Sequence, residues 1–216
     1  VLPVRILLKE EQDEIKAQVE ETNKILDELA EDIEKAIEEY KAAEAAEAQA
    51  AQEVSNIIAQ YNAQKAAQAA AGGTVTEEVV NEDGTVTTVT KPAESTGVTG
   101  TGTLVWPVPS SMVITSRYGN RSDPFTGQTS YHSGIDIDGF NKDGYPVVAS
   151  DGGTVITASS NSGYGNYVII DHGGGIVSLY GHMSSISVKA GQKVSAGQQI
   201  GKVGSTGVSS GPHLHL

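Results

Sequence analysis

Two kinds of hydrophobic pattern divide this chain. From Lys9 to about Ala71 there is neither glycine nor proline, and apolar residues recur at alternating steps of four and three. This spacing places apolar side chains on one face of a helix. From Leu104 onward, short apolar and β-branched runs are separated by glycine-rich turns, which is typical of antiparallel strands. The pattern therefore predicts a long helix followed by an all-β domain.

The helical pattern follows a heptad register without a slip, through Ile15, Val19, Thr22, Leu26, Leu29, Ile33, Ala36, Tyr40, Ala43, Glu47, Ala50, Val54, Ile57 and Tyr61. Such a register predicts a coiled coil, and the helix would be roughly 90 Å long. Because one helix cannot bury its apolar stripe alone, it needs a partner. The candidates are a second copy of the chain, an upstream helix or the β domain.

Between these parts, Gly72-Gly73 ends the helix. Two Thr/Val runs on either side of Asp83-Gly84 then predict a β-hairpin. Residues 91–102 are rich in glycine, serine and threonine, as in flexible linkers. We therefore expect a helical coiled-coil arm at 1–72, a linker with the hairpin at 73–103, and a β domain at 104–216 of the sandwich or barrel type.

Composition excludes several classes of protein. The 216 residues carry a formal net charge of −13, and residues 1–72 alone hold 16 Asp/Glu against 7 Lys/Arg. Nucleic acid is bound by basic surfaces, so we expect no nucleic-acid partner. There is no cysteine and hence no thiolate metal site. No apolar run is long enough for a transmembrane segment, and no signal peptide is recognisable in a chain that starts Val1-Leu2-Pro3.

The candidate chemistry lies in three short segments that contain four of the five histidines: Tyr131–Asp136, Tyr180–Met183 and Gly211–Leu216. In a strand, His213 and His215 share one face while Leu214 and Leu216 point into the core. An ideal strand would hold His132 and Asp136 roughly 13 Å apart, too far for one ion. We therefore predict a bend or bulge at Gly134. Zinc is the natural candidate ion, since it accepts imidazole and carboxylate and its catalytic sites commonly use three protein ligands.

These segments resemble the M23 family of zinc metallopeptidases, the lysostaphin-like or LytM-like peptidoglycan endopeptidases. The resemblance runs from about Trp106 to Leu216 and includes Arg117–Gly119, Asp123–Gly127, His132–Ile137, Gly163–Val168, Tyr180–Met183, Gly204–Gly207 and Gly211–His215. It implies that His132, Asp136 and His215 bind one Zn²⁺ and that His182 and His213 are the catalytic histidines. It also implies an all-β peptidase domain. Tyr118, Tyr164 and Asn166 are expected to line the substrate groove, with core packing as the alternative for the tyrosines.

The resemblance further implies what the protein does and where. We expect metal-activated water to hydrolyse stem or bridge peptides of bacterial peptidoglycan outside the cell or at its wall. The family's domain ordinarily continues beyond the His-x-His strand, so a C-terminally truncated domain is expected here. Some wall hydrolases with this layout carry a coiled coil that docks on a division-associated membrane complex and restrains the peptidase. The alternative function is accordingly a non-catalytic or autoinhibited wall-binding module regulated by its coiled coil.

A third alternative comes from residues 188–203, which look like the turns of biotinyl or lipoyl carrier domains. Such carriers attach a cofactor to a lysine at a hairpin tip, but neither Lys193 nor Lys202 has the acidic-residue and methionine context that they use. His172 lies in a glycine-rich turn between two expected strands, and we interpret it as a turn residue. A passive scaffold built on the coiled coil completes the alternatives.

Overall fold

The structure is a computed structural model that describes residues 2–71, 74–80, 86–92, 100–122, 129–139 and 144–216. By their contacts these residues form two units. One contains the first part of the helix, up to Ala45, and the other contains Ala46–Ser122 and Thr129–Leu216. All of the predicted metal and catalytic residues lie in the second unit.

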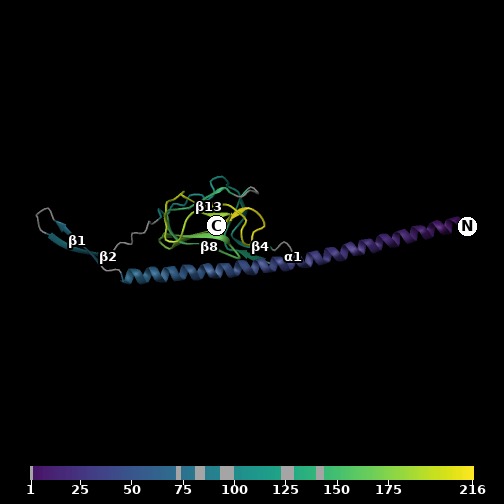
Figure 1. Ribbon diagram of the computed structural model, residues 1–216, viewed down its shortest axis with the longest axis horizontal. Helices are drawn as coiled ribbons and strands as arrows, with labels where there is room; N and C mark the ends of the chain where they lie inside the picture. The colour runs from purple at the N-terminus through teal and green to yellow at the C-terminus, as the bar shows by residue number, and fades with distance from the viewer. Residues whose placement is uncertain (1, 72–73, 81–85, 93–99, 123–128, 140–143) are drawn as a thin grey trace. The chain divides into compact units, whose positions relative to one another are not determined.

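Helix α1 runs without interruption from Leu2 to Ala71 (Figure 1). It confirms the predicted helix and begins earlier than Lys9, because Pro3 is tolerated in a first helical turn. In the first unit, the apolar positions Ile15, Val19 and Ile33 are exposed, and the coiled-coil partner stays a prediction. Among the described residues, no helix is long and apolar enough to cross a membrane.

A two-stranded antiparallel hairpin follows the helix. Strand β1 (Thr74–Val80) pairs with β2 (Val86–Pro92), with Thr74 opposite Pro92 and Val80 opposite Val86. This confirms the predicted pairing of the Thr/Val runs, while the expected Asp83-Gly84 turn and most of the expected linker lie outside the described residues. The end of that linker is tied to the β domain, since Gly100 donates its N–H to the carbonyl of His172 and Gly102 donates to Asp151.

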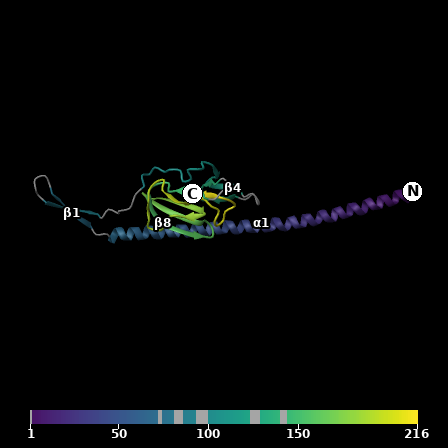
Figure 2. The same ribbon diagram turned by 45° about the horizontal axis from the view of Figure 1, so that its top comes forward.

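The β domain is built on a seven-stranded sheet of order β12-β8-β9-β10-β14-β6-β3. Its strands β8, β9 and β10 lie side by side (Figures 1 and 2). In chain order the sheet comprises β3 (Ile114–Ser116), β6 (Asp136–Asp138), β8 (Gly153–Asn161), β9 (Gly165–Gly173), β10 (Ile176–Met183), β12 (Lys193–Val194) and β14 (His213–His215). A three-stranded sheet contains β11 (Ser185–Ile186), β13 (Gln199–Lys202) and β7 (Pro146–Val148), and a two-stranded one pairs β4 (Gly119–Ser122) with β5 (Thr129–His132). The all-β prediction is confirmed.

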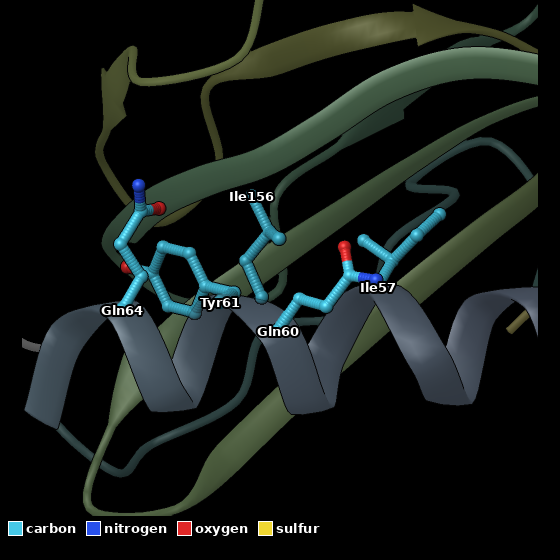
Figure 3. Close-up of a pocket in the computed structure, with 5 residues that line it drawn as sticks. All are labelled: Ile57, Gln60, Tyr61, Gln64 and Ile156. Atoms are coloured by element: carbon cyan, nitrogen blue, oxygen red, sulfur yellow. The ribbon is translucent and has the colours of Figure 1, made fainter.

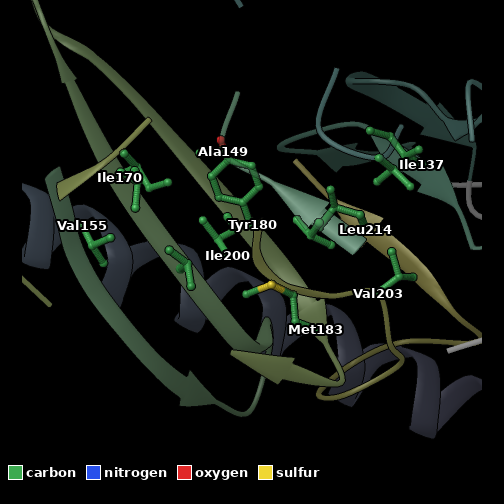
Figure 4. Close-up of a cluster of buried hydrophobic side chains, with 13 residues drawn as sticks. Ile137, Ala149, Val155, Ile170, Tyr180, Met183, Ile200, Val203 and Leu214 are labelled. Atoms are coloured by element: carbon green, nitrogen blue, oxygen red, sulfur yellow. The ribbon is translucent and has the colours of Figure 1, made fainter. Parts of the chain in front are cut away.

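The main hydrophobic core joins the large sheet to the three-stranded sheet (Figure 4). It includes Ile137 and Leu214 from the strands that carry the metal-binding motifs, and Ile200 and Val203 from the other side. Ile137 and Leu214 are completely buried and face each other in the β6–β14 register. Burying each such side chain contributes about 1.5–3 kcal/mol. This packing fixes the two strands on which the predicted ligands alternate with core residues.

A second hydrophobic cluster joins the later part of α1 to the large sheet. Ala50 and Val54 of the helix are buried with Tyr164, Tyr167 and Ile169. Further along, the helix and β8 line an open, shallow pocket with a volume of about 370 Å³. Figure 3 shows Ile156 of β8 beside the helical residues that line the pocket; they are Ile57, Gln60, Tyr61 and Gln64. For this part of the stripe, the β domain is therefore the partner that buries it.

Candidate metal centre

The chain bends sharply between His132 and Asp136. His132 ends β5, Asp136 begins β6, and these strands belong to different sheets. As a result His132 Nε2 lies 3.2 Å from Asp136 Oδ1, which confirms the predicted bend. Gly134 is needed for a close approach: a Cβ there would lie 2.5 Å from the carbonyl oxygen of Leu216 and 2.7 Å from His215 Nε2.

The His-x-His strand β14 brings the third residue of the predicted metal set to the same place. It pairs with β6, with His215 opposite Asp136 and His213 opposite Asp138. His215 is only 4% exposed and Leu214 is fully buried, so the expected alternation of faces is confirmed. Beyond the strand, Leu216 exchanges two backbone hydrogen bonds with Ile135, of 2.8 and 2.9 Å. These bonds hold the strand beside the bend.

The donor atoms of His132, Asp136 and His215 fit a single metal ion. His132 Nε2, Asp136 Oδ1 and His215 Nδ1 are each 3.2 Å from the other two. Zinc binds nitrogen and carboxylate ligands at about 2.0–2.2 Å in tetrahedral geometry, in which neighbouring ligand atoms lie about 3.3 Å apart. The three donors therefore already have the spacing of one face of such a tetrahedron.

The hydrogen bonds around His132 set its tautomer. Its Nδ1 lies 3.0 Å from the carbonyl oxygen of Arg117. A carbonyl oxygen can only accept, so Nδ1 carries a proton; when the ring is neutral, the lone pair that a metal ion could take is on Nε2, the nitrogen that faces Asp136 and His215. A backbone carbonyl on the far ring nitrogen is the common support for a metal-binding histidine. This role of Arg117 could not be predicted from its residue type, because any residue supplies a carbonyl.

Electrostatics favour a negative carboxylate at the centre. Burial opposes ionisation of Asp136, but hydrogen bonds from His132 and His215 outweigh it and hold the pKa of this carboxyl well below its usual range. In return, the hydrogen bond to Asp136 raises the pKa of His132. Protons and a cation therefore compete for the same three atoms, and metal binding must release a proton from His132 in acid.

His182 reaches the centre through an irregular part of β10. Between Tyr180 and Met183 the register with β9 shifts, and His182 has a backbone φ of 59°. Such a φ is uncommon for a residue with a Cβ and is often found at functional sites. The carbonyl of Tyr164 holds the backbone in this conformation by accepting the His182 N–H at 2.8 Å. The bulge thus turns the imidazole toward His213, with ring centroids 4.7 Å apart.

The two predicted catalytic histidines share one hydrogen-bonding arrangement. His182 Nδ1 donates to the carbonyl of Thr206, and His213 Nδ1 donates to the carbonyl of Gly211, each at 2.8 Å. A neutral ring with its proton on Nδ1 has its lone pair on Nε2, and Nε2 of His213 lies 3.6 Å from Asp136 Oδ1. Burial, followed by the neighbouring His213, lowers the pKa of His182 to about 4. His182 is therefore neutral at ordinary pH and able to accept a proton.

The three predicted groove residues lie in different surroundings. Tyr118 is 64% exposed and its ring meets the edge of Tyr131, to which its hydroxyl is hydrogen-bonded. Tyr164 is 4% exposed; its ring centroid lies 5.1 Å from that of His215. Asn166 bonds through its side chain to the carbonyl of Met183 and through its N–H to Thr206 Oγ1. Contact of these three residues with substrate stays a prediction.

The fifth histidine lies outside this centre. His172 is 3% exposed; its Nδ1 donates to the carbonyl of Gly152 at 2.8 Å, and its Nε2 is 2.7 Å from Ser178 Oγ. The Ser178 hydroxyl is in turn bonded to that of Tyr180, which accepts the N–H of Ser150. Both ring nitrogens are therefore occupied by structural partners, and His172 is part of the buried framework of β9 and β10.

Comparison with known proteins identifies the β domain. Residues 130–216 match Peptidase family M23. The β domain is an M23 peptidase domain. The chain is 42% identical over 111 residues to peptidoglycan DD-endopeptidase ShyA of Vibrio cholerae, a match that covers 51% of this chain and 25% of that protein. The chain thus matches about a quarter of the length of this curated relative.

Two solved structures are similar to the M23 domain. A zinc-containing peptidase from Vibrio cholerae is 30% identical, with a TM-score of 0.49 and coverage of 65% of this chain and 42% of that one. The catalytic domain of lysostaphin from Staphylococcus simulans is 34% identical, with a TM-score of 0.43 and coverage of 48% and 76%. The match to Peptidase family M23 includes the complete His132–Asp136–His215 set.

Proposed function

We propose that this chain is a zinc endopeptidase that hydrolyses peptide cross-links of bacterial peptidoglycan. The observation that carries the proposal is that three donor atoms lie 3.2 Å from one another, beside two further imidazoles that are each oriented by a backbone carbonyl at Nδ1. The name of the Vibrio cholerae relative, a peptidoglycan DD-endopeptidase, supports the substrate class. The same substrate places its action in the cell envelope.

In this proposal, His132, Asp136 and His215 would hold the zinc ion, which supplies a Lewis acid and lowers the pKa of a water to about 7. The chain's own part is proton transfer. Nε2 of His182 or His213 accepts a proton from the water as the water oxygen attacks the scissile carbonyl carbon. The imidazolium then returns a proton to the amine that leaves when the C–N bond breaks. Thr206 and Gly211 keep each ring oriented through its Nδ1–H.

The non-catalytic alternative has no specific observation in its favour, since all five residues of the implied set meet at one place. The role of the exposed part of the helical stripe is a separate proposal: it would bind a second copy of the chain or a division-associated membrane complex.

The test is release of new amino termini from purified peptidoglycan by the full chain, with zinc and again after chelation. Zinc-dependent release, lost in His213→Ala, is the expected result, and the freed amino group identifies the bond. The control is His172→Ala, which removes a buried histidine that is not in the centre. Release that survives chelation, or that persists in His213→Ala, would contradict the proposal.

A further inference from the structure

One side of the Asn161–Gly165 loop is packed against helix α1. A Cβ placed on Gly163 would overlap the methyl group of Ala50 and lie 2.8 Å from the carbonyl oxygen of Ala46. It would also lie 3.2 Å from the Cα of Glu47. The backbones of loop and helix therefore approach as closely as small residues allow, and glycine is required at position 163 by this contact.

Polar contacts fasten the helix at both ends of strand β9. At one end, Asn161 Nδ2 donates to Glu53 Oε2 at 3.2 Å, while Asn161 Oδ1 accepts the N–H of Tyr164 at 2.8 Å. At the other end, Lys65 Nζ is 2.7 Å from Asp171 Oδ2, and the Tyr61 hydroxyl bonds to the same oxygen at 3.2 Å. Burial raises the pKa of Asp171, but the hydrogen bonds from Lys65, the Gly173 N–H and Tyr61, together with the charge of Lys65, outweigh it and lower this pKa. The helix is thus specifically docked in this register.

The other side of the same loop supports the metal centre. The carbonyl of Tyr164 accepts the N–H of His182, and the carbonyl of Gly163 accepts the N–H of Val208, each at 2.8 Å. The Tyr164 ring packs against the imidazoles of His215 and His182, at centroid distances of 5.1 and 6.4 Å. Its hydroxyl lies 3.3 Å from Ser133 Oγ, beside the bend that follows His132. Tyr164 therefore contacts His215 and His182 directly and reaches the segment next to His132, so it touches the surroundings of three of the four site histidines.

Tyr164 is buried because the helix covers it. It belongs to the cluster with Ala50 and Val54, whereas the larger core beneath the sheet is a separate cluster. The unusual backbone of His182, with a φ of 59°, has its N–H bonded to the Tyr164 carbonyl. Such a conformation persists only when its surroundings over-determine it. Removal of the helix would expose the ring that backs His215 and loosen the loop that fixes His182.

We propose that the 46–65 segment of α1 is a positioning element for the metal centre and that Tyr164 is the positioning residue through which it acts. The docked helix holds Tyr164, and Tyr164 holds His215 by its ring and His182 by its carbonyl. Any partner that draws this segment away from the sheet would thereby lower the metal affinity of the domain. This inference uses the metal centre of the proposed function but does not require that peptidoglycan be its substrate.

The test compares two pairs of substitutions on the same helix turns of the full chain. Ala50→Glu with Val54→Glu places two carboxylates in the buried face; Ala48→Glu with Gln52→Glu places them, at the same spacing, in the exposed face. Both pairs add two negative charges. Burying an unpaired carboxylate is costly, so the inward pair releases the helix while the outward pair leaves it docked.

The first readout is zinc affinity, measured by competition with a chromophoric chelator. Loss of outer supports typically weakens metal binding by about 10–100-fold, and we expect that loss for the inward pair and none for the outward pair. Tyr164→Leu should reproduce the loss with the helix intact. Tyr164→Phe keeps the ring against His215 and should retain nearly full affinity.

The second readout is hydrogen exchange in the metal-free chain. The amides of His182 and Val208, which donate to Tyr164 and Gly163, should exchange faster in the inward pair. The amides of Ala149 and Val155, bonded to Gln198 and Gln192 in the other part of the domain, should not change. Equal zinc affinity in the two pairs would refute the proposal, and so would equal loosening of all four amides. Neither outcome depends on peptide hydrolysis.

Discussion

Two buried histidine sites in the M23 domain differ in one respect that decides their chemistry. The exposed fractions of His215 and His172 are 4% and 3%, and both residues lie in strands of the seven-stranded sheet, His215 in β14 and His172 in β9. His172 has a hydrogen-bonding partner on each ring nitrogen, the carbonyl of Gly152 and the hydroxyl of Ser178. At the metal centre, His132, His182 and His213 each have one ring nitrogen tied to a backbone carbonyl. Their other nitrogen faces the centre.

This contrast shows that burial alone does not indicate function for a histidine. A fully bonded imidazole strengthens the fold, because its donors and acceptors are satisfied away from water. An imidazole that is fixed by a backbone carbonyl at one nitrogen, and whose other nitrogen meets only members of the centre, is available as a ligand or a base. Removing a histidine from each site tests this difference directly, and measuring how the individual rings bind protons tests it in more detail.

The largest difference is expected in zinc affinity, between the variants His215→Ala and His172→Ala. Loss of His215 removes one of three donors, so zinc affinity should fall by at least about 100-fold, more than the loss of an outer support causes. Loss of His172 leaves Ser178 and Gly152 without their buried partner, which should lower the free energy of unfolding by about 1–3 kcal/mol. Chelator competition measures the first quantity and urea unfolding of the metal-free chain measures the second. Equal zinc affinity in the two variants would contradict the assignment of His215.

A second pair of variants, His182→Ala and His213→Ala, tests catalysis separately from metal binding. His182→Ala and His213→Ala leave all three metal donors in place, so each variant should still bind one zinc ion. Because each removes a candidate proton acceptor, the rate of peptide hydrolysis should fall by about 10²–10⁴-fold. Zinc content and the rate of amino-terminus release, measured on the same samples, check this prediction. Loss of zinc together with loss of rate would show instead that these imidazoles stabilise the metal site.

Much of this centre could be predicted from the sequence. The alternation in His213-Leu214-His215 fixes which faces the side chains occupy, and the separation of His132 from Asp136 requires a bend before both can reach one ion. Local spacing carries this information. The heptad stripe likewise predicted that Ala50 and Val54 face a partner, and the β domain was among the candidates.

Other features could not be predicted, for two physical reasons. The groups that set the tautomers of His132, His182 and His213 are backbone carbonyls of Arg117, Thr206 and Gly211, which every residue type possesses. The docking of α1 on the loop at Gly163 joins segments more than a hundred residues apart. Its signal is only the absence of a side chain at one glycine in a chain with 25 of them. Burial of Tyr164 follows from that contact.

In the metal-free chain, the pKa values of His182 and His132 should be shifted in opposite directions. Burial and then His213 lower the pKa of His182 to about 4, whereas the hydrogen bond to Asp136 raises that of His132 above its ordinary value near 6.5. NMR titration of the ring protons should therefore find His132 charged at a pH where His182 is neutral. Titration of both rings together near pH 6.5 would contradict this arrangement.

The same shifts predict how folding stability depends on pH. Between pH 6.5 and about 4, His182 gains a proton in the unfolded chain but stays neutral in the folded one. The unfolded state then binds more protons, so His182 lowers the free energy of unfolding as the pH falls through this window. His132 acts in the opposite sense: its contribution is complete below 6.5 and is lost as the pH rises through its raised pKa. Urea unfolding of His182→Ala should show a weaker loss of stability in acid than the unmodified chain.

The smallest effect concerns the exposed Tyr118, the predicted groove residue whose surroundings differ most from those of Tyr164. If its hydroxyl contacts substrate, Tyr118→Phe removes a hydrogen bond of about 0.5–1.5 kcal/mol net, and KM should rise by about 2–10-fold with kcat unchanged. The matched control is Tyr131→Phe, since these two hydroxyls are bonded to each other. A change confined to Tyr118→Phe would indicate direct contact with substrate. Equal changes in both variants would mean that the pair acts through its mutual hydrogen bond, and no change in either would place the substrate elsewhere along the centre.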